Sequence, residues 1–200
     1  MQTQAAMTGH GKTRWAEMNS KVYDLAHYSF AKGERILLDA NIWIYLFPAP
    51  SGKKYKYAYQ YSSAFDKLIM AEAQPIIDPI VLSEYLNRYC RIEYDAAYNL
   101  KYEIYKEFRQ SSDFSAVAET AECFAMKILK CCRVHSLPTN DLDLRFALEE
   151  FKSGKIDFND CLLVDLCKKE NLKLMTNDKD FQRMGIEILT SNPSLLKAYS

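Results

Sequence analysis

Short apolar runs alternate along the chain with longer segments in which apolar residues recur every three or four positions. The short runs are typical of buried strands and lie at 36–38, 74–78, 172–175 and 186–189. The longer segments predict helices at 40–47, from about 57, from 79, and at 93–110, 114–134, 141–151 and 156–170. This order of strands and helices predicts a three-layer α/β/α sandwich with a central, mainly parallel sheet.

The same pattern suggests how the chain is divided. Residues 1–34 form an N-terminal extension, with a helix expected from Trp15 to Phe30 and a break at Gly33. Residues 35–192 read as one α/β domain, in which the helical segment 93–151 is an elaboration, and 193–200 form a C-terminal tail. We find no internal repeat and no low-complexity linker.

Charge and hydropathy exclude several kinds of protein. Lys and Arg number 26 and so do Asp and Glu, so the formal net charge is zero, and any nucleic-acid binding must rest on a local patch or on metal ions. No apolar run approaches the roughly 18 residues that a membrane helix needs. The first residues lack the order of a secretion signal. We therefore expect a cytoplasmic protein without membrane contact.

Cysteine and histidine offer little chemistry. The six cysteines have no paired C-x-x-C spacing, which argues against zinc, and we expect them to be buried and weakly apolar. The three histidines are too scattered for a catalytic triad or a metal cage. Any catalytic chemistry must then come from carboxylates.

Four acids stand where an α/β sheet exposes side chains. Asp39 follows the first predicted strand, Glu84 lies in the helix after the second, Asp160 opens the helix after the turn at Gly154, and Asp178 follows the strand at 172–175. Acids gathered without basic partners repel one another, and a hard cation such as Mg²⁺ or Mn²⁺ relieves that repulsion. Such a site suits metal-assisted cleavage of a phosphodiester.

Each acid also has a purely structural interpretation. Asp39 or Asn41 would cap the helix that follows. Glu84 is four residues before Arg88 and would form an ion pair on the helix surface.

The later acids have structural alternatives too. Asp157 and Asp160 have the spacing of a capping box, and for Asp157 we favour that role. Asp178 would be a turn residue, and Asp180 would cap the short helical piece at 179–185. The convergence of four acids on one end of the sheet favours a shared site over four separate structural roles.

Four segments resemble the motifs of the PIN domain (PilT N-terminus) ribonucleases. In order they are LLDANIWIYLF, SEYLNR, DFNDCLLVDLCKKENLKLMTNDKDF and IEILT. The resemblance covers about 35–90 and 153–190, and its most specific part is the block in which a helix, a strand and T-x-D-x-D-F occur together. The segment 93–151 has no counterpart that we can align.

The resemblance implies a role for each acid. Asp39, Asp160 and Asp178 would bind one or two Mg²⁺ or Mn²⁺ ions, and Glu84 would bind or position the attacking water. Thr176 and Asn41 match polar residues that support the metal, and Asp157 and Asp180 have a secondary place beside the site.

The resemblance also implies an activity and partners. The expected activity is metal-dependent endonucleolytic cleavage of RNA, single-stranded or structured. Many short bacterial members of the family are toxins of toxin–antitoxin pairs, so a small antitoxin partner and a homodimer are further expectations.

A basic and aromatic segment follows the first helix. Lys53, Lys54 and Lys56 alternate with Tyr55 and with two further tyrosines, and eleven of the fourteen tyrosines lie between positions 45 and 105. Rings that stack on unpaired bases and lysines that contact phosphates bind single strands without reading sequence. For residues 53–57, we give equal weight to contact with RNA or with a partner and to a structural role.

Three tyrosines further along have a different expected place. Tyr61, Tyr85 and Tyr89 fall on helix faces, and we expect them to pack on the core or on a dimer partner rather than to bind RNA.

Two other functions compete with that of a ribonuclease. A phosphatase of the haloacid dehalogenase type also begins with an Asp after its first strand, but it needs a second Asp two residues later, where this chain has Asn41. The other alternative is a PIN fold that serves as an RNA- or protein-binding scaffold with weak catalysis, which the presence of all four acids disfavours.

Overall fold

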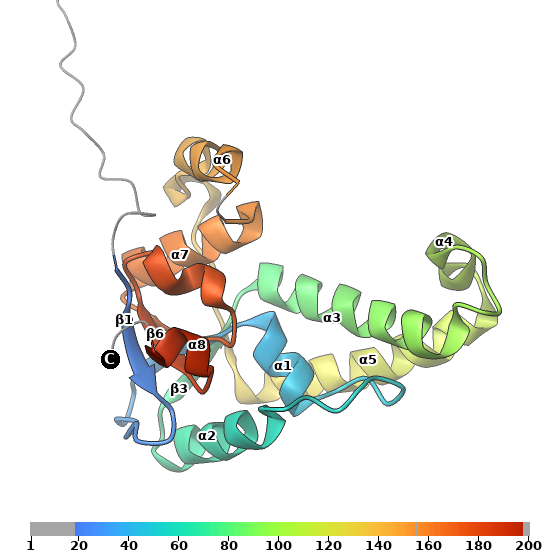
Figure 1. The fold of residues 1–200 in the computed structure, drawn as a ribbon, viewed down its shortest axis with the longest axis horizontal. Helices are drawn as coiled ribbons and strands as arrows, with labels where there is room; N and C mark the ends of the chain where they lie inside the picture. The colour runs from blue at the N-terminus through green and yellow to red at the C-terminus, as the bar shows by residue number, and fades with distance from the viewer. Residues whose placement is uncertain (1–18, 155, 198–200) are drawn as a thin grey trace, which may run out of the picture.

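Six short strands form a single sheet in the computed structural model, which describes residues 19–154 and 156–197 (Figure 1). Every pair of neighbouring strands runs parallel, and the order across the sheet is β1-β6-β5-β2-β3-β4. The strands are β1 (Lys21–Asp24), β2 (Arg35–Leu38), β3 (Gln74–Ile77), β4 (Arg133–Val134), β5 (Lys173–Met175) and β6 (Glu187–Thr190).

Helices cover both faces of this sheet. The layer formed by α6 and α7 lies on one side, and α1, α2, α3 and α5 lie on the other (Figure 1). The predicted three-layer α/β/α architecture is therefore confirmed. The α-helices are α1 (Ala40–Leu46), α2 (Ala58–Met70), α3 (Pro79–Glu93), α4 (Tyr105–Arg109), α5 (Ser112–Cys131), α6 (Leu144–Lys152), α7 (Phe158–Glu170) and α8 (Pro193–Leu196). None of these helices, in the part of the chain described, has the length and apolarity needed to cross a bilayer.

The strands at the centre of the sheet follow directly from their sequence. Ile36, Leu37 and Leu38 are fully buried because β2 has a strand on each side and helices on both faces. A parallel strand of this kind needs a continuous apolar run rather than an alternating one. This is the pattern from which the central strands were predicted.

Helix α3 begins at the predicted position. Asp78 accepts a hydrogen bond from the backbone nitrogen of Ile80 at 2.7 Å, and Pro79 occupies the first helical position, where its missing N–H is not needed. This cap holds the start of α3 directly at the end of β3, so its first two turns lie beside the carboxyl ends of the strands.

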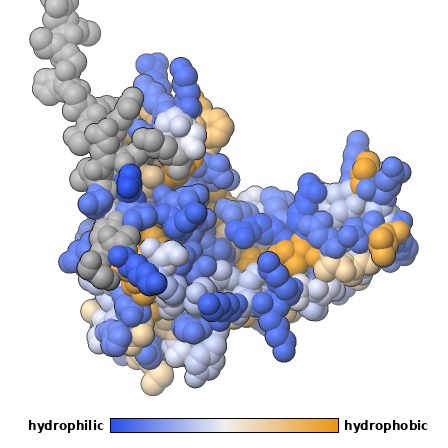
Figure 2. Space-filling view, viewed as in Figure 1, coloured by the Kyte–Doolittle hydropathy of each residue, from blue (hydrophilic) through white to orange (hydrophobic). Residues whose placement is uncertain are grey.

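Helices α3, α4 and α5 form an arm that extends away from the sheet (Figure 1). Between them runs a groove of about 470 Å³ lined by Leu86, Cys90, Phe114, Ala118 and Ala121 among others. Figure 2 shows hydrophobic surface on the arm where α3 and α5 meet, on an otherwise largely hydrophilic face. Buried residues of the arm, such as Phe108 and Ile128, belong to the same hydrophobic cluster as those of the sheet.

Two helix predictions were wrong. The expected helix from Trp15 to Phe30 begins outside the described residues, and its later part contains the edge strand β1, which pairs with β6, followed by a turn. The expected helix over 93–110 is interrupted: α3 ends at Glu93, a π-helical turn covers Tyr94–Tyr98, and only α4 resumes. In the second place Tyr94 and Tyr98 pack on Phe108 of α4.

The edge strand β4 was not predicted. It has only two residues, both exposed, so it carries no apolar signal, and pairing with β3 alone defines it.

Candidate active site at the carboxyl ends of the strands

The strand order places the candidate site between β2 and β5. The chain leaves β2 toward β3 on one side, and β5 adds to the other side of β2, so the connections diverge at this point. Open parallel sheets bind ligands in the crevice that such a divergence opens outside the carboxyl ends of the strands. Asp39 follows β2 there, and Thr176 to Asp178 follow β5.

Asp39 is the most buried acid of the site, with 4% of its surface exposed. Thr176 donates a hydrogen bond from Oγ1 to Asp39 Oδ2 at 2.7 Å, and the side-chain amide of Asn41 also donates to Oδ2. Asp39 is the first residue before α1 but makes no side-chain capping bond. The capping interpretation of Asp39 is therefore not supported.

Asn41 links the two strand ends. Its amide nitrogen also donates to Thr176 Oγ1 at 3.2 Å, and its oxygen accepts from the backbone nitrogen of Asn177 at 3.2 Å. Thr176 Oγ1 in turn accepts from the backbone nitrogen of Asp178 at 3.0 Å. The network fixes the position of Asp178 relative to Asp39.

Tyr61, in α2, contacts the turn that carries Thr176 and Asn177. Its buried hydroxyl lies 3.1 Å from the carbonyl of Thr176, 3.0 Å from Asn177 Oδ1, 3.1 Å from Thr190 Oγ1 and 3.1 Å from the backbone nitrogen of Ser191. Burial raises the pKa of Tyr61 far above its ordinary value, so the hydroxyl stays protonated. The sequence predicted a core role for this tyrosine but not its contact with the site.

Two further acids reach the site from helices. Glu84 lies on the second turn of α3 and Asp160 in the first turn of α7, and both are partly exposed. Burial, followed by the negative charges of Asp39, Glu84, Asp178 and Asp157, raises the pKa of Asp160 to about 8.

Asp39 is affected in the same way. Burial raises the pKa of Asp39 to about 6, the hydrogen bond from Thr176 opposes the rise, and the charges of Glu84 and Asp178 add to it. The four predicted acids therefore come together closely enough for each to act on the others.

Asp157 and Asp180 lie at the outer edge of this cluster. Both are exposed and line a small pocket of about 120 Å³ with Phe151, Gly154 and Ile156. Burial, then the charge of Asp178, raises the pKa of Asp180. Their position beside the acids agrees with a secondary place at the site.

Their predicted capping roles differ from those observed. Asp157 occupies the cap position of α7 but makes no side-chain capping bond, so the capping box that we favoured does not form. The short helix at Lys179–Arg183 is capped by Asp178, which accepts from the backbone nitrogen of Asp180 at 3.0 Å.

The donor set suits a hard divalent cation that retains water ligands. Within residues 19–154 and 156–197, no group of three or more His, Cys, Asp and Glu side chains is arranged so that it could hold a metal ion. Mg²⁺ does not need three such ligands, since it is commonly held by one or two carboxylates together with waters and substrate oxygens. The raised pKa values of Asp39 and Asp160 mark uncompensated negative charge that a cation would neutralise.

Arg88 is a residue at the rim of the site to which the sequence assigned no functional role. Its Nη1 lies 3.3 Å from Glu84 Oε1, as the spacing of four residues predicted, and its side chain is 49% exposed. Its positive charge also acts on Tyr45 and Tyr55, where it opposes the rise of both phenol pKa values that burial causes. The i, i+4 spacing was the available signal, but it did not show that the guanidinium stands beside these rings.

The lysines of the segment 53–57 are exposed on a loop. Lys53, Lys54 and Lys56 face solvent, and Tyr55 is half-buried against Tyr45, with ring centroids 5.0 Å apart. The predicted core role of the later tyrosines is confirmed, because Tyr61, Tyr85 and Tyr89 are all buried.

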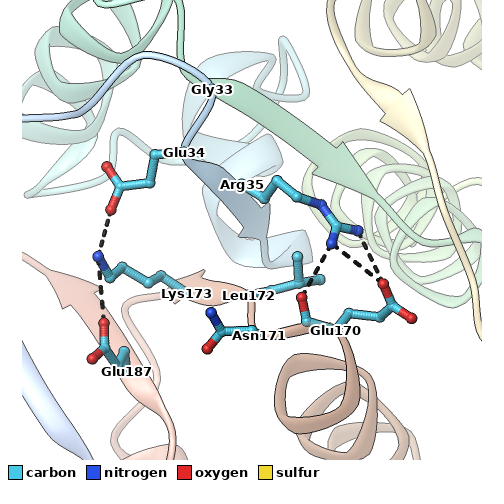
Figure 3. Close-up of a pocket in the computed structure, with 8 residues that line it drawn as sticks. All are labelled: Gly33, Glu34, Arg35, Glu170, Asn171, Leu172, Lys173 and Glu187. Carbon is cyan, nitrogen blue, oxygen red and sulfur yellow. Dashed lines mark hydrogen bonds and ion pairs between the residues drawn. The ribbon is translucent and has the colours of Figure 1, made fainter.

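A second polar pocket, of about 510 Å³, lies at the amino ends of the strands, opposite the acids (Figure 3). Each charged side chain in it is paired with a side chain of opposite charge. Arg35 pairs with Glu170 at 3.2 Å, and Lys173 pairs with Glu34 at 2.5 Å and with Glu187 at 3.4 Å. This compensation distinguishes it from the uncompensated cluster of acids.

The fold and the site together define a class of protein: an α/β protein with an open parallel sheet and a cluster of carboxylates where the connections between its strands diverge. The PIN domain family model matches residues 36–187, so the chain belongs to the PIN domain family, whose members are nucleases that hydrolyse phosphodiester bonds. The predicted family is confirmed. A comparison with curated protein sequences gives no match.

Two solved structures are similar in fold. The crystal structure of VapBC2 from Rickettsia felis bound to a DNA fragment from their promoter has 18% identity and a TM-score of 0.48, and the match covers 77% of this chain and 98% of that one. The crystal structure of PAE2754 from Pyrobaculum aerophilum has 16% identity and a TM-score of 0.44, with 84% and 97% covered.

Proposed function

We propose that the protein is a metal-dependent endoribonuclease that hydrolyses phosphodiester bonds of single-stranded RNA, with Mg²⁺ or Mn²⁺ as cofactor. The observation that carries the proposal is the convergence of Asp39, Glu84, Asp160 and Asp178, from four separate segments, around one point where the pKa of Asp160 is raised to about 8 by burial and by the other acids. A buried excess of negative charge costs stability, and function is the usual reason for such a cost.

In the proposed mechanism Asp39, Asp160 and Asp178 would hold the cation, together with water molecules and substrate oxygens. A bound divalent ion lowers the pKa of water and stabilises charge on the phosphoryl and leaving oxygens. Thr176 and Asn41 both donate to Oδ2 of Asp39 and hold its carboxylate in one orientation. Glu84 accepts a proton from, or orients, the water that attacks the phosphorus in line.

The test is cleavage of an unstructured, end-labelled RNA in Mn²⁺, in Mg²⁺ and in EDTA. We expect activity only with metal, and loss of at least a hundredfold in Asp39→Asn, since removal of a charge-stabilising group typically costs that much. Full activity of Asp39→Asn would overturn the proposal. A phosphomonoester assay on the same samples separates this function from a phosphatase, and binding of RNA without cleavage would indicate a scaffold.

The partners are a separate part of the proposal. The family resemblance suggests a toxin that works with a small antitoxin, and a homodimer, in the cytoplasm. Expression of the chain alone should then arrest growth of a bacterial host, and expression of Asp39→Asn should not. Normal growth with soluble, nuclease-active protein would reject the toxin role but leave the nuclease in place.

A further inference from the structure

Helix α3 leads from the acids outward, and Arg88 is the first cation along it. Glu84 and Arg88 are one helical turn apart, a rise of about 6 Å. This is comparable to the separation of successive phosphates along an extended strand. We infer that Arg88 forms a subsite that binds the phosphate next to the one being cleaved, so that the RNA strand runs outward along α3; this inference rests on the proposed function.

The guanidinium of Arg88 can bind a second anion in addition to Glu84. Only Nη1 of Arg88 is engaged with Glu84, at 3.3 Å, and about half of the side chain is open to solvent. An exposed ion pair between residues i and i+4 is weak, so an incoming phosphate competes with it at little cost. Guanidinium presents a planar fork of donors that fits the oxygens of a phosphate.

Two tyrosines lie near the guanidinium of Arg88. Tyr45 and Tyr55 contact each other with centroids 5.0 Å apart, and Tyr45 also packs on the buried Tyr61, at 5.4 Å. Both rings lie close enough to Arg88 for its positive charge to oppose the rise of their phenol pKa values that burial causes. They also place aromatic surface where the base attached to the bound phosphate would lie.

The basic loop continues the same path. The backbone nitrogen of Ser51 donates to the buried Glu93 at 2.8 Å, which ties the loop to the far end of α3. Gly52 packs so closely on this helix that a Cβ would lie 2.8 Å from Ile92 Cγ2. The loop runs from this anchor at Ile92 to Tyr55, which lies near Arg88, and it carries Lys53 and Lys54, both exposed, between these two points. Acids, Arg88 and lysines therefore follow one another along α3.

The decisive experiment compares the cleavage of two substrates by the 200-residue chain. Oligouridylate has phosphates on both sides of the cleaved bond, whereas the dinucleotide uridylyl-uridine has only the bond that is cleaved. Arg88→Gln should lower kcat/KM for oligouridylate relative to uridylyl-uridine by about tenfold, the effect of losing a hydrogen bond to a charged group. Arg88→Lys, which keeps the charge but loses the fork, should give a smaller change.

A binding measurement in the Asp160→Asn background, where no cleavage occurs, tests the subsite without catalysis. Fluorescence anisotropy of labelled oligouridylate should show about tenfold weaker binding for the double variant with Arg88→Gln. The slope of log K against log salt should fall in magnitude by about 0.7, the value for one phosphate contact on a single strand. Lys67→Gln, an exposed charge near the end of α2 that leads to the amino end of β3, is the matched control and should change neither quantity.

Three results would overturn the inference. If Arg88→Gln lowered kcat/KM equally for both substrates, Arg88 would act only through Glu84. Unchanged binding and salt slope, or an equal effect of Lys67→Gln, would show that no phosphate is bound at this place. If the wild-type protein cleaved no RNA, the proposed function would fail, and the binding measurement would still decide whether Arg88 contacts the strand.

Discussion

Thr176 Oγ1 donates a hydrogen bond of 2.7 Å to Asp39 Oδ2 and so joins the ends of two adjacent strands at the centre of the site. The residues are 137 positions apart in the sequence. The bond opposes the effect of burial on the pKa of Asp39, so the carboxylate is kept closer to its charged form, which is the form that the proposed metal binding needs.

Thr176→Val is the first prediction that this contact allows. The valine keeps the shape but removes the donor, so the pKa of Asp39 should rise and Mn²⁺ should bind about 10- to 100-fold more weakly, as is usual when a partner of a metal ligand is lost. Titration of Mn²⁺ by isothermal calorimetry measures the change. Thr120→Val, an exposed threonine that bonds only within α5, is the control. Equal Mn²⁺ affinity in all three proteins would contradict the prediction.

Asp160→Asn should stabilise the metal-free protein while removing its activity. The amide cannot ionise, so the repulsion that raises the pKa of Asp160 to about 8 disappears. At pH 8.5 we expect the melting temperature in EDTA to rise by several degrees. Asp66→Asn, an exposed acid on α2, should change it little. A lower melting temperature for Asp160→Asn would show that the carboxylate stabilises the fold.

The stability of the metal-free protein should fall between pH 6 and pH 8.5. In this range Asp160, and at the lower end Asp39, still hold protons in the folded state that the unfolded chain has released, because their pKa values are raised from 3.8 to about 8 and about 6. When the folded state binds more protons than the unfolded state, the free energy of unfolding decreases as pH rises. Thermal melts in EDTA measure this trend.

Added divalent metal should reverse this loss of stability at higher pH. Mg²⁺ or Mn²⁺ competes with protons for the same carboxylates, so the rise in melting temperature on adding metal should be larger at pH 8.5 than at pH 6. Ca²⁺ and Na⁺ at matched ionic strength separate site binding from general screening. A metal effect that is equal at the two pH values would argue against proton competition at these acids.

Tyr61→Phe should destabilise the protein and slow its chemistry. The hydroxyl has four polar groups within 3.1 Å, and its loss leaves buried partners unsatisfied, at a cost of about 1–3 kcal/mol in the free energy of unfolding. Because two of those partners, Thr176 and Asn177, belong to the turn that carries Asp178, kcat should fall as well. Denaturant unfolding and RNA cleavage measure the two effects. Tyr59→Phe, at a ring 82% exposed, should alter neither.

Much of the fold could be predicted because its signals are local. The four apolar runs became β2, β3, β5 and β6, since strands buried on both faces need continuous apolar sequence. The edge strands β1 and β4 could not be predicted in this way. They are partly or wholly exposed, and only the neighbouring strand with which each one pairs makes it a strand.

The sequence by itself predicted which acids would lie together, because each follows a recognisable strand or lies in the first turns of a recognisable helix, and parallel strands bring those positions to one edge. Tertiary structure alone decided how the acids are held and what surrounds them. The bonds from Thr176 and Asn41 to Asp39, the support of Tyr61, and the place of Arg88 beside Tyr45 and Tyr55 join residues from different segments. Such contacts depend on how strands pair and helices pack, and no local pattern of apolar and polar residues encodes them.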